Sequence, residues 1–183
     1  VTRGALPAGQ DVKPGALEKW AAKTSLRATM KREAQGLESP LPPTDENLAA
    51  GVALYVANCQ VCHGGPEAVA SPIARGLSPD APQLAKHGVE DDPEGTIYWK
   101  IAHGIRFTGM PSFRQGLSDR EIWQISLFAK RMDKLPPGRA LWEGGSALDK
   151  YGTPEAVRAA RDKASEAPLP EPGGRGELPA HVS

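Results

Sequence analysis

The stretch Cys59-Gln60-Val61-Cys62-His63 decides how this chain is interpreted. Its cysteines are the only two in 183 residues, which is too few for the disulfide framework of a small secreted domain. On a helix, two side chains three positions apart lie on one face, one turn apart. The motif therefore presents two sulfur atoms together, with an imidazole directly after them.

C-x-x-C-H is the attachment signature of c-type haem. Two thiols one turn apart reach the two vinyl groups on one porphyrin edge, and His63 then lies under the iron. Two interpretations stay open beside this one. A thioredoxin-like redox pair needs a βαβ context that the sequence lacks. A zinc site needs two further ligands, from His87, His103 or His181. We expect the first two of these to be surface or capping residues, and the last to lie in a flexible tail.

A second motif, Thr108-Gly109-Met110-Pro111, follows further along the chain. A methionine between glycine and proline lies on an irregular loop, and such a loop can bring its sulfur over the opposite side of a haem held by one histidine. Met30 and Met132 lie on predicted helices, where core packing explains them. We therefore predict that the iron ligands are His63 and Met110.

Composition divides the chain into three predicted parts. Residues 1–44, an arm with a helix and a Pro-rich linker, hold 7 basic and 4 acidic side chains. Residues 45–135, the central domain, hold 9 and 11, and residues 136–183, a Pro/Gly-rich extension, hold 6 and 7. The formal net charge is zero, which argues against a nucleic-acid-binding protein.

Capping and breaking residues predict an all-α chain. The predicted helices run from Pro14 to about Gln35, from Thr44 or Asp45 to near the cysteines, from Asp92 (N-cap) and Pro93 to Gly104, from the Ser118–Glu121 capping box to Pro136, and over about 153–165. Three large side chains of the extension suggest that part of it packs on the core: Trp142, Leu148 and Tyr151.

Three motifs occur in a familiar order. They are Gly51-x-x-x-Tyr55-x-x-x-Cys59-x-x-Cys62-His63-Gly64, then Gly109-Met110-Pro111-x-Phe113, then Leu117-Ser118-Asp119 with a helix that carries Trp123. Over about residues 45–135 the chain resembles a class I monohaem cytochrome c. The resemblance implies the all-α class I cytochrome c fold with a covalently bound haem. It also implies that the first and last helices of the domain cross at Gly51, with Trp123 as the aromatic partner.

The resemblance further implies a proline carbonyl that holds the second ring nitrogen of the iron-binding histidine. Pro82 matches that position best, and Pro72 is a weaker candidate. Haem propionates also need hydrogen-bond donors. The residues that we expect to serve them are Arg106, four positions before Met110, and Trp99, through its indole N–H.

An iron with both axial positions filled has no open site for a substrate. We therefore expect a one-electron carrier rather than an enzyme, with redox partners docking at the exposed haem edge around Cys59, Cys62 and the Met110 loop. One alternative is a cytochrome subunit or docking module of a larger redox complex. Another is a haem peroxidase or gas-binding domain, which requires Met110 to leave the iron.

The expected location is outside the bacterial cytoplasm, where c-type haem is attached. The chain begins at Val1, so we expect that a signal peptide or membrane anchor has been removed. It contains no apolar run of about 18 residues, which a transmembrane helix needs. A periplasmic protein, or one on the outer face of the cytoplasmic membrane, fits these features.

Overall fold

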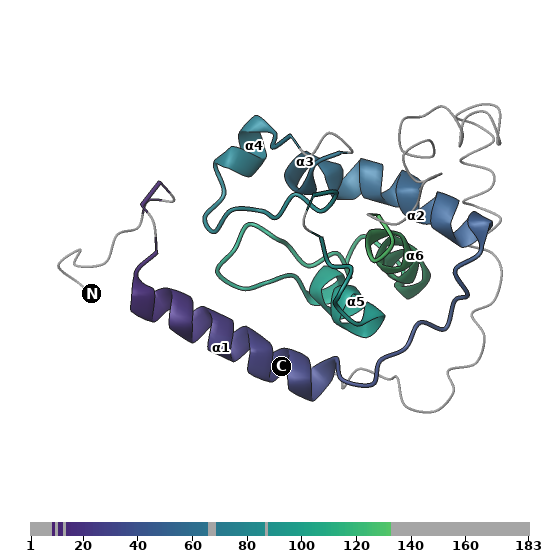
Figure 1. Cartoon of the computed structure of the whole chain (residues 1–183), viewed down its shortest axis with the longest axis horizontal. Helices are drawn as coiled ribbons and strands as arrows, with labels where there is room; N and C mark the ends of the chain where they lie inside the picture. The colour runs from purple at the N-terminus through teal and green to yellow at the C-terminus, as the bar shows by residue number, and fades with distance from the viewer. Residues whose placement is uncertain (1–8, 10, 13, 66–68, 87, 133–183) are drawn as a thin grey trace.

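The computed structural model describes residues 9, 11–12, 14–65, 69–86 and 88–132 (Figure 1). Within those residues all regular structure is helical, as predicted. The helices are α1 (Ala16–Glu33), α2 (Asp45–Asn58), α3 (Gln60–His63), α4 (Pro72–Arg75), α5 (Glu94–His103) and α6 (Asp119–Ala129). Several predicted features lie outside the described residues: the extension over 136–183 with its helix and its large side chains, His87 and His181.

Helices α2 and α6 cross at the centre of the fold (Figure 1). At the crossing, a Cβ on Gly51 would lie 2.2 Å from the carbonyl oxygen of Gln124 and 2.9 Å from Cβ of Phe128. Only glycine allows this approach, so the predicted role of Gly51 is confirmed. The ring of Phe128 also meets Tyr55 edge-on, with the ring centroids 5.4 Å apart.

Trp123 is not the aromatic partner at this crossing, contrary to the prediction. Its ring stacks on Tyr98 of α5 with centroids 4.2 Å apart, and the Tyr98 hydroxyl donates to Asp119 at 2.7 Å. Trp123 and Phe128 are five positions apart, which turns their side chains about 140° from each other around an α-helix. Phe128 therefore faces α2, whereas Trp123 joins α6 to α5.

Helix starts follow the predicted caps with one exception. The Thr44 side chain caps α2, and Ser118 with Glu121 forms the capping box of α6. In α5 the N-cap is Pro93, not Asp92, and the Asp92 carboxylate instead forms an ion pair with Lys100 at 2.6 Å. Helix α6 ends at Ala129, earlier than predicted.

The arm is joined to the domain at its C-terminal end. Helix α1 ends beside α5, and Ala34 directly after it is only 2 % exposed. Leu37 packs against Gly95 so closely that a Cβ there would lie 2.4 Å from the Leu37 Cβ. Leu41, within the Pro-rich linker, belongs to the hydrophobic core. The linker is thus extended, as predicted, but it is packed against the central domain.

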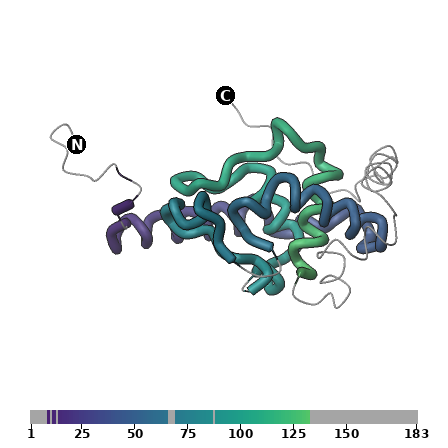
Figure 2. The backbone as a smooth tube through the Cα atoms, turned by 90° about the horizontal axis from the view of Figure 1, so that it is seen from above, coloured from purple at the N-terminus to yellow at the C-terminus, as the bar shows by residue number. Residues whose placement is uncertain are grey.

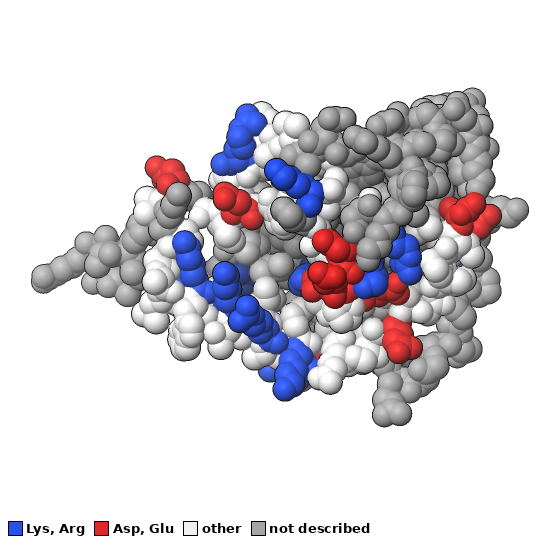
Figure 3. Space-filling view, in the orientation of Figure 1, with Lys and Arg blue, Asp and Glu red and all other residues white. Residues whose placement is uncertain are grey.

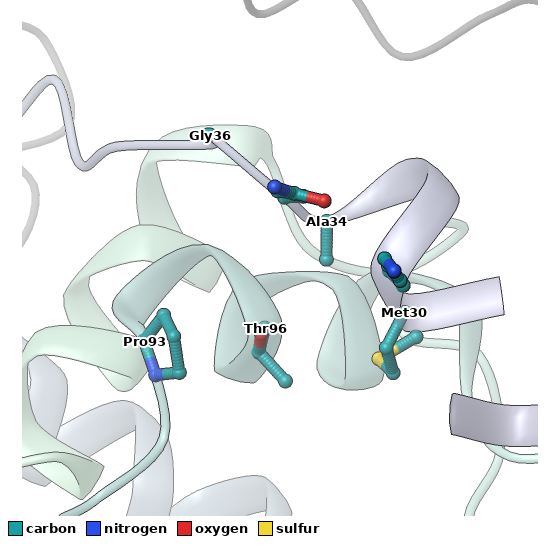
Figure 4. Close-up of a pocket in the computed structure, with 7 residues that line it drawn as sticks. Met30, Ala34, Gly36, Pro93 and Thr96 are labelled. Carbon is teal, nitrogen blue, oxygen red and sulfur yellow. The ribbon is translucent and has the colours of Figure 1, made fainter. Parts of the chain in front are cut away.

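A shallow pocket of about 280 Å³ lies where α1 meets α5 (Figure 4). Met30 and Ala34 line it from the arm, and Pro93 and Thr96 from the start of α5. No helix in the described part of the chain combines the length and the apolarity needed to cross a membrane.

Candidate functional site

The two cysteines lie at the junction of α2 and α3. The N–H of Cys59 donates to the Tyr55 carbonyl at 2.8 Å, and the N–H of His63 donates to the Cys59 carbonyl at 2.9 Å, so the motif forms one helical turn. Cys59 is buried, Cys62 is partly buried, and both are free thiols. Burial, with a smaller effect of the neighbouring Cys62, raises the pKa of the Cys59 thiol to about 12. At neutral pH Cys59 is therefore a thiol and not a reactive thiolate.

The imidazole of His63 is held by the carbonyl of Pro82. The distance from Nδ1 of His63 to the Pro82 oxygen is 3.0 Å. A carbonyl only accepts hydrogen bonds, so Nδ1 carries the proton and the lone pair of Nε2 is left for a metal. Burial lowers the pKa of His63, against the opposing effect of the Pro82 hydrogen bond, and favours the neutral ring that binds metals. Pro72, the weaker candidate, instead begins α4.

Gln83 joins the loop that contains Pro82 to the C-x-x-C-H turn. Its side-chain amide Nε2 donates to the Cys62 carbonyl at 3.0 Å and to the Ala81 carbonyl at 3.2 Å. In the next residue, the N–H of Leu84 donates to the His63 carbonyl at 3.1 Å. Gln83 was not predicted from the sequence, although its position directly after Pro82 was a usable signal.

The Met110 loop is fixed to the end of α5. Gly104 ends that helix with φ 67°, and a Cβ there would lie 2.7 Å from the Met110 carbonyl oxygen. That oxygen accepts from the Ile105 N–H at 3.2 Å, and the Met110 N–H donates to the Thr108 hydroxyl at 3.1 Å. The Met110 side chain is partly buried and packs against the core. The loop is thus an ordered structure that presents a thioether.

The loop that follows α4 connects the two halves of the site. At one end, Pro82 and Gln83 contact the C-x-x-C-H turn. At the other end, Leu77 packs against Gly109, where a Cβ would lie 2.3 Å from a Leu77 methyl carbon. The segment from 77 to 83 therefore touches both the histidine turn and the methionine loop.

The same residues lie inside a match to a known family. Residues 46–128 match the family model described as "Cytochrome C oxidase, cbb3-type, subunit III". The match runs from the first turn of α2 to Phe128 in α6, and so includes the histidine turn, the Pro82 loop and the Met110 loop. Residues 46–128 form a c-type cytochrome domain. The predicted fold class and the resemblance are thereby confirmed.

Two individual proteins are also similar to the chain. Phosphoribosylamine–glycine ligase of Leifsonia xyli subsp. xyli is 39% identical over 75 residues, which cover 37% of this chain and 18% of the ligase. The chain thus spans less than a fifth of that relative. A chain of the Kuenenia stuttgartiensis reducing HAO-like protein complex is 25% identical, with a TM-score of 0.43 over 53% of this chain and 47% of that one.

The donor set of the cytochrome domain fits haem c. It offers two free thiols one turn apart, an imidazole nitrogen and a thioether. Within the described residues, no three or more His, Cys, Asp or Glu side chains are grouped so as to hold a metal ion, and no strand flanks the cysteines. The zinc and thioredoxin-like interpretations find no support there. A c-type cytochrome domain is an electron carrier.

The two residues predicted to serve the propionates differ in their surroundings. The indole N–H of Trp99 donates to the Glu33 carboxylate of α1 at 3.1 Å, and its ring lies 4.6 Å from that of His103. In this structure the indole N–H of Trp99 is bonded to the arm, and its role at a propionate stays a prediction. Arg106 is exposed at the start of the Met110 loop, and its role at a propionate stays a prediction.

Proposed function

We propose that the cytochrome domain carries one haem, attached covalently through Cys59 and Cys62, and that His63 and Met110 are the axial ligands of its iron. The contact of 3.0 Å between Nδ1 of His63 and the Pro82 carbonyl carries this proposal most directly. It sets the tautomer and the ring orientation that a haem-binding histidine requires.

The bound haem supplies an iron that takes up and releases one electron. The chain keeps both axial ligands on ordered backbone, His63 through Pro82 and Gln83, and Met110 through the Gly104 turn. Ligands that move little between two oxidation states add little to the barrier for electron transfer. The soft sulfur of Met110 favours Fe(II), which raises the potential above that of a bis-histidine iron.

Apolar side chains around the cysteine turn support electron exchange at this edge. Val61, between the cysteines, and Val69 and Ile73, around α4, are all exposed. The Ser71 hydroxyl donates to the Val61 carbonyl and so keeps the two segments together. We assign this edge to the docking of redox partner proteins, in the periplasm or on the outer face of the cytoplasmic membrane.

The optical spectrum of the purified, reduced protein tests the proposal. We expect sharp c-type bands from one haem per chain that stays with the polypeptide in acid acetone, and we expect Cys59→Ala to weaken that retention. Haem that is fully extracted from the wild type would overturn covalent attachment.

Met110→Ala should convert an iron that does not bind CO into one that does. Ready CO binding by the wild type would instead favour a gas-binding domain.

A further inference from the structure

Helix α1 projects from the cytochrome domain without being covered. None of its 18 residues is buried, and residues 15–25 are all exposed. Its N-terminal half presents two large apolar side chains, Leu17 at 76% exposure and Trp20 at 64%. Leu17 and Trp20 are three positions apart and so lie next to each other on the helix surface, and adjoining exposed apolar groups of this kind are typical of an interaction site.

A row of cations follows one side of this helix (Figure 3). It consists of Lys19, Lys23, Arg27 and Lys31, called here the basic ridge. The spacing of four residues puts neighbouring members next to each other, and all four are exposed. None of them forms an ion pair with another residue among those described. Like charges at this spacing destabilise a helix slightly, and a negatively charged partner would remove that effect.

The helix holds the ridge in a fixed place relative to the site. Its last turn is bonded to α5 through Glu33 and Trp99, and Ala34 and Leu37 pack against the domain. Figures 1 and 2 show the N-terminal end of α1 at the same end of the molecule as the α4 loop and the loop between α5 and α6. The ridge, about 18 Å long, can therefore orient a partner with respect to the Met110 loop.

The distribution of apolar groups favours a protein over a lipid surface. A helix that lies in a membrane interface needs an apolar face along its length. In α1 the large apolar residues are split, because Met30 points toward α5 (Figure 4) whereas Trp20 faces solvent. A single exposed tryptophan beside cations is instead typical of a protein interface, where an aromatic anchor is surrounded by charges.

We propose that the basic ridge and Trp20 form a docking surface for the acidic face of a redox partner protein. This role rests on the proposed electron transfer, since only a carrier needs a partner held close to its haem. The ridge would supply attraction at long range and orientation, and Trp20 the short-range contact. Both lie outside residues 46–128, the part of the chain that matches the cytochrome family.

Binding of defined acidic polypeptides to the haem-loaded full chain tests the proposal by calorimetry at low ionic strength. The probes are poly-glutamate, a glutamate–tyrosine copolymer, and vesicles that contain phosphatidylglycerol. We expect K23Q/R27Q to weaken poly-glutamate binding about three- to tenfold. The matched double variant K86Q/R114Q removes the same charge from two other exposed cations and should change binding less than twofold. Trp20→Ala should weaken binding of the copolymer but not of poly-glutamate.

Equal losses in both double variants would overturn the proposal, since attraction would then follow net charge alone. A wild-type chain that binds the vesicles but neither polypeptide would also overturn it, in favour of a lipid surface. The proposed function fails separately, through a wild-type spectrum that lacks covalently bound, methionine-ligated haem. A normal wild-type spectrum together with unchanged binding of poly-glutamate by K23Q/R27Q would contradict the docking surface but not the proposed function.

Discussion

Helices α6 and α1 are the two extremes of this molecule. All but two of the 11 residues of α6 are buried, whereas none of the 18 residues of α1 is. The helix with the weaker intrinsic helix propensity is the buried one. The buried α6 contains Ile122, Trp123 and Phe128, which are mediocre helix formers, whereas α1 is rich in alanine, lysine, arginine and glutamate, which are good ones.

The difference shows two ways of stabilising a helix. Packing against α2 and α5 determines α6, so its helical state depends on distant residues such as Gly51 and Tyr98. Composition and one anchored end determine α1, because none of its residues is buried. A substitution where α6 packs against α2 should therefore destabilise the whole domain. A substitution in α1 should change only the stability of that helix. Five changes test this contrast, in order of decreasing effect.

Gly51→Ala should have the largest effect. The added methyl group would lie 2.2 Å from the Gln124 carbonyl oxygen, and backbone has to move to admit it. We expect a loss of about 3 kcal/mol in the free energy of unfolding, measured by denaturant titration of the haem-loaded protein. Gly15→Ala is the matched control at the start of α1, since no atom lies within 4 Å of a Cβ there. Similar stabilities of the two variants would contradict the account of the α2–α6 crossing.

Gln83→Leu comes next. It removes the amide that donates to the carbonyls of Cys62 and Ala81, and leaves both without that donor. We expect a loss of about 1–2 kcal/mol in the free energy of unfolding. The reduction potential should also shift, because the His63 turn loses one of the bonds that join it to the Pro82 loop. Gln115→Leu, at an exposed glutamine, should change neither quantity. A potential that does not move would limit Gln83 to a role in stability.

Local signals in the sequence predicted much of the fold and of the site. Caps predicted the start of α2 and of α6, because the bonds of a capping residue reach only two or three positions along the chain. The C-x-x-C-H turn was predicted by motif and the Pro82 contact by the family resemblance, and the structure contains both the turn and the contact. Haem ligation by Met110 stays a prediction.

Contacts between residues far apart in the sequence could not be predicted. Trp99 bonds to Glu33, which is 66 residues away, and no local pattern indicates that pairing. The stacking of Trp123 on Tyr98 depends on how α5 lies against α6, which composition does not specify. The same holds for Leu41, which lies in the predicted Pro-rich linker although the core covers its side chain. The error for Trp123 concerns a contact between elements, whereas the errors at the start of α5 and at the end of α6 concern only the boundaries of an element.

Trp99→Phe should loosen the arm and leave the domain intact. The ring is kept but the N–H that donates to Glu33 is lost, so we expect about 1 kcal/mol less protection in the last turn of α1. Amide hydrogen exchange measures this region by region. Exchange in α6 should be unchanged. An equal loss of protection in α6 would show that the arm and the domain unfold together.

Acid should weaken the same junction. The hydrogen bond from Arg32 is the main reason that the pKa of Glu33 is lowered, with a further lowering by Trp99, while burial opposes both. A lowered pKa in the folded state means that the contribution of Glu33 is complete above its ordinary value, about 4.3, and is lost as the pH falls through the folded value. Hydrogen exchange at the end of α1 should quicken over that range. Glu33→Gln should remove this dependence on pH; a dependence that persists would point to another group.

Neutralising the basic ridge should have the smallest effect, and of opposite sign. In Lys23→Gln one cation leaves a row in which its neighbours, Lys19 and Arg27, are four positions away on either side. We expect α1 to gain about 0.2–0.5 kcal/mol in local stability at low salt, with no change in the melting of the domain. Added salt should erase the gain, since it screens exposed charges. Hydrogen exchange of α1 at two ionic strengths measures both effects.

A helix weakened by Lys23→Gln would mean that Lys23 has a stabilising contact. A gain in stability combined with weaker binding of acidic polypeptides would instead show that α1 keeps its cations for a partner and not for its own folding.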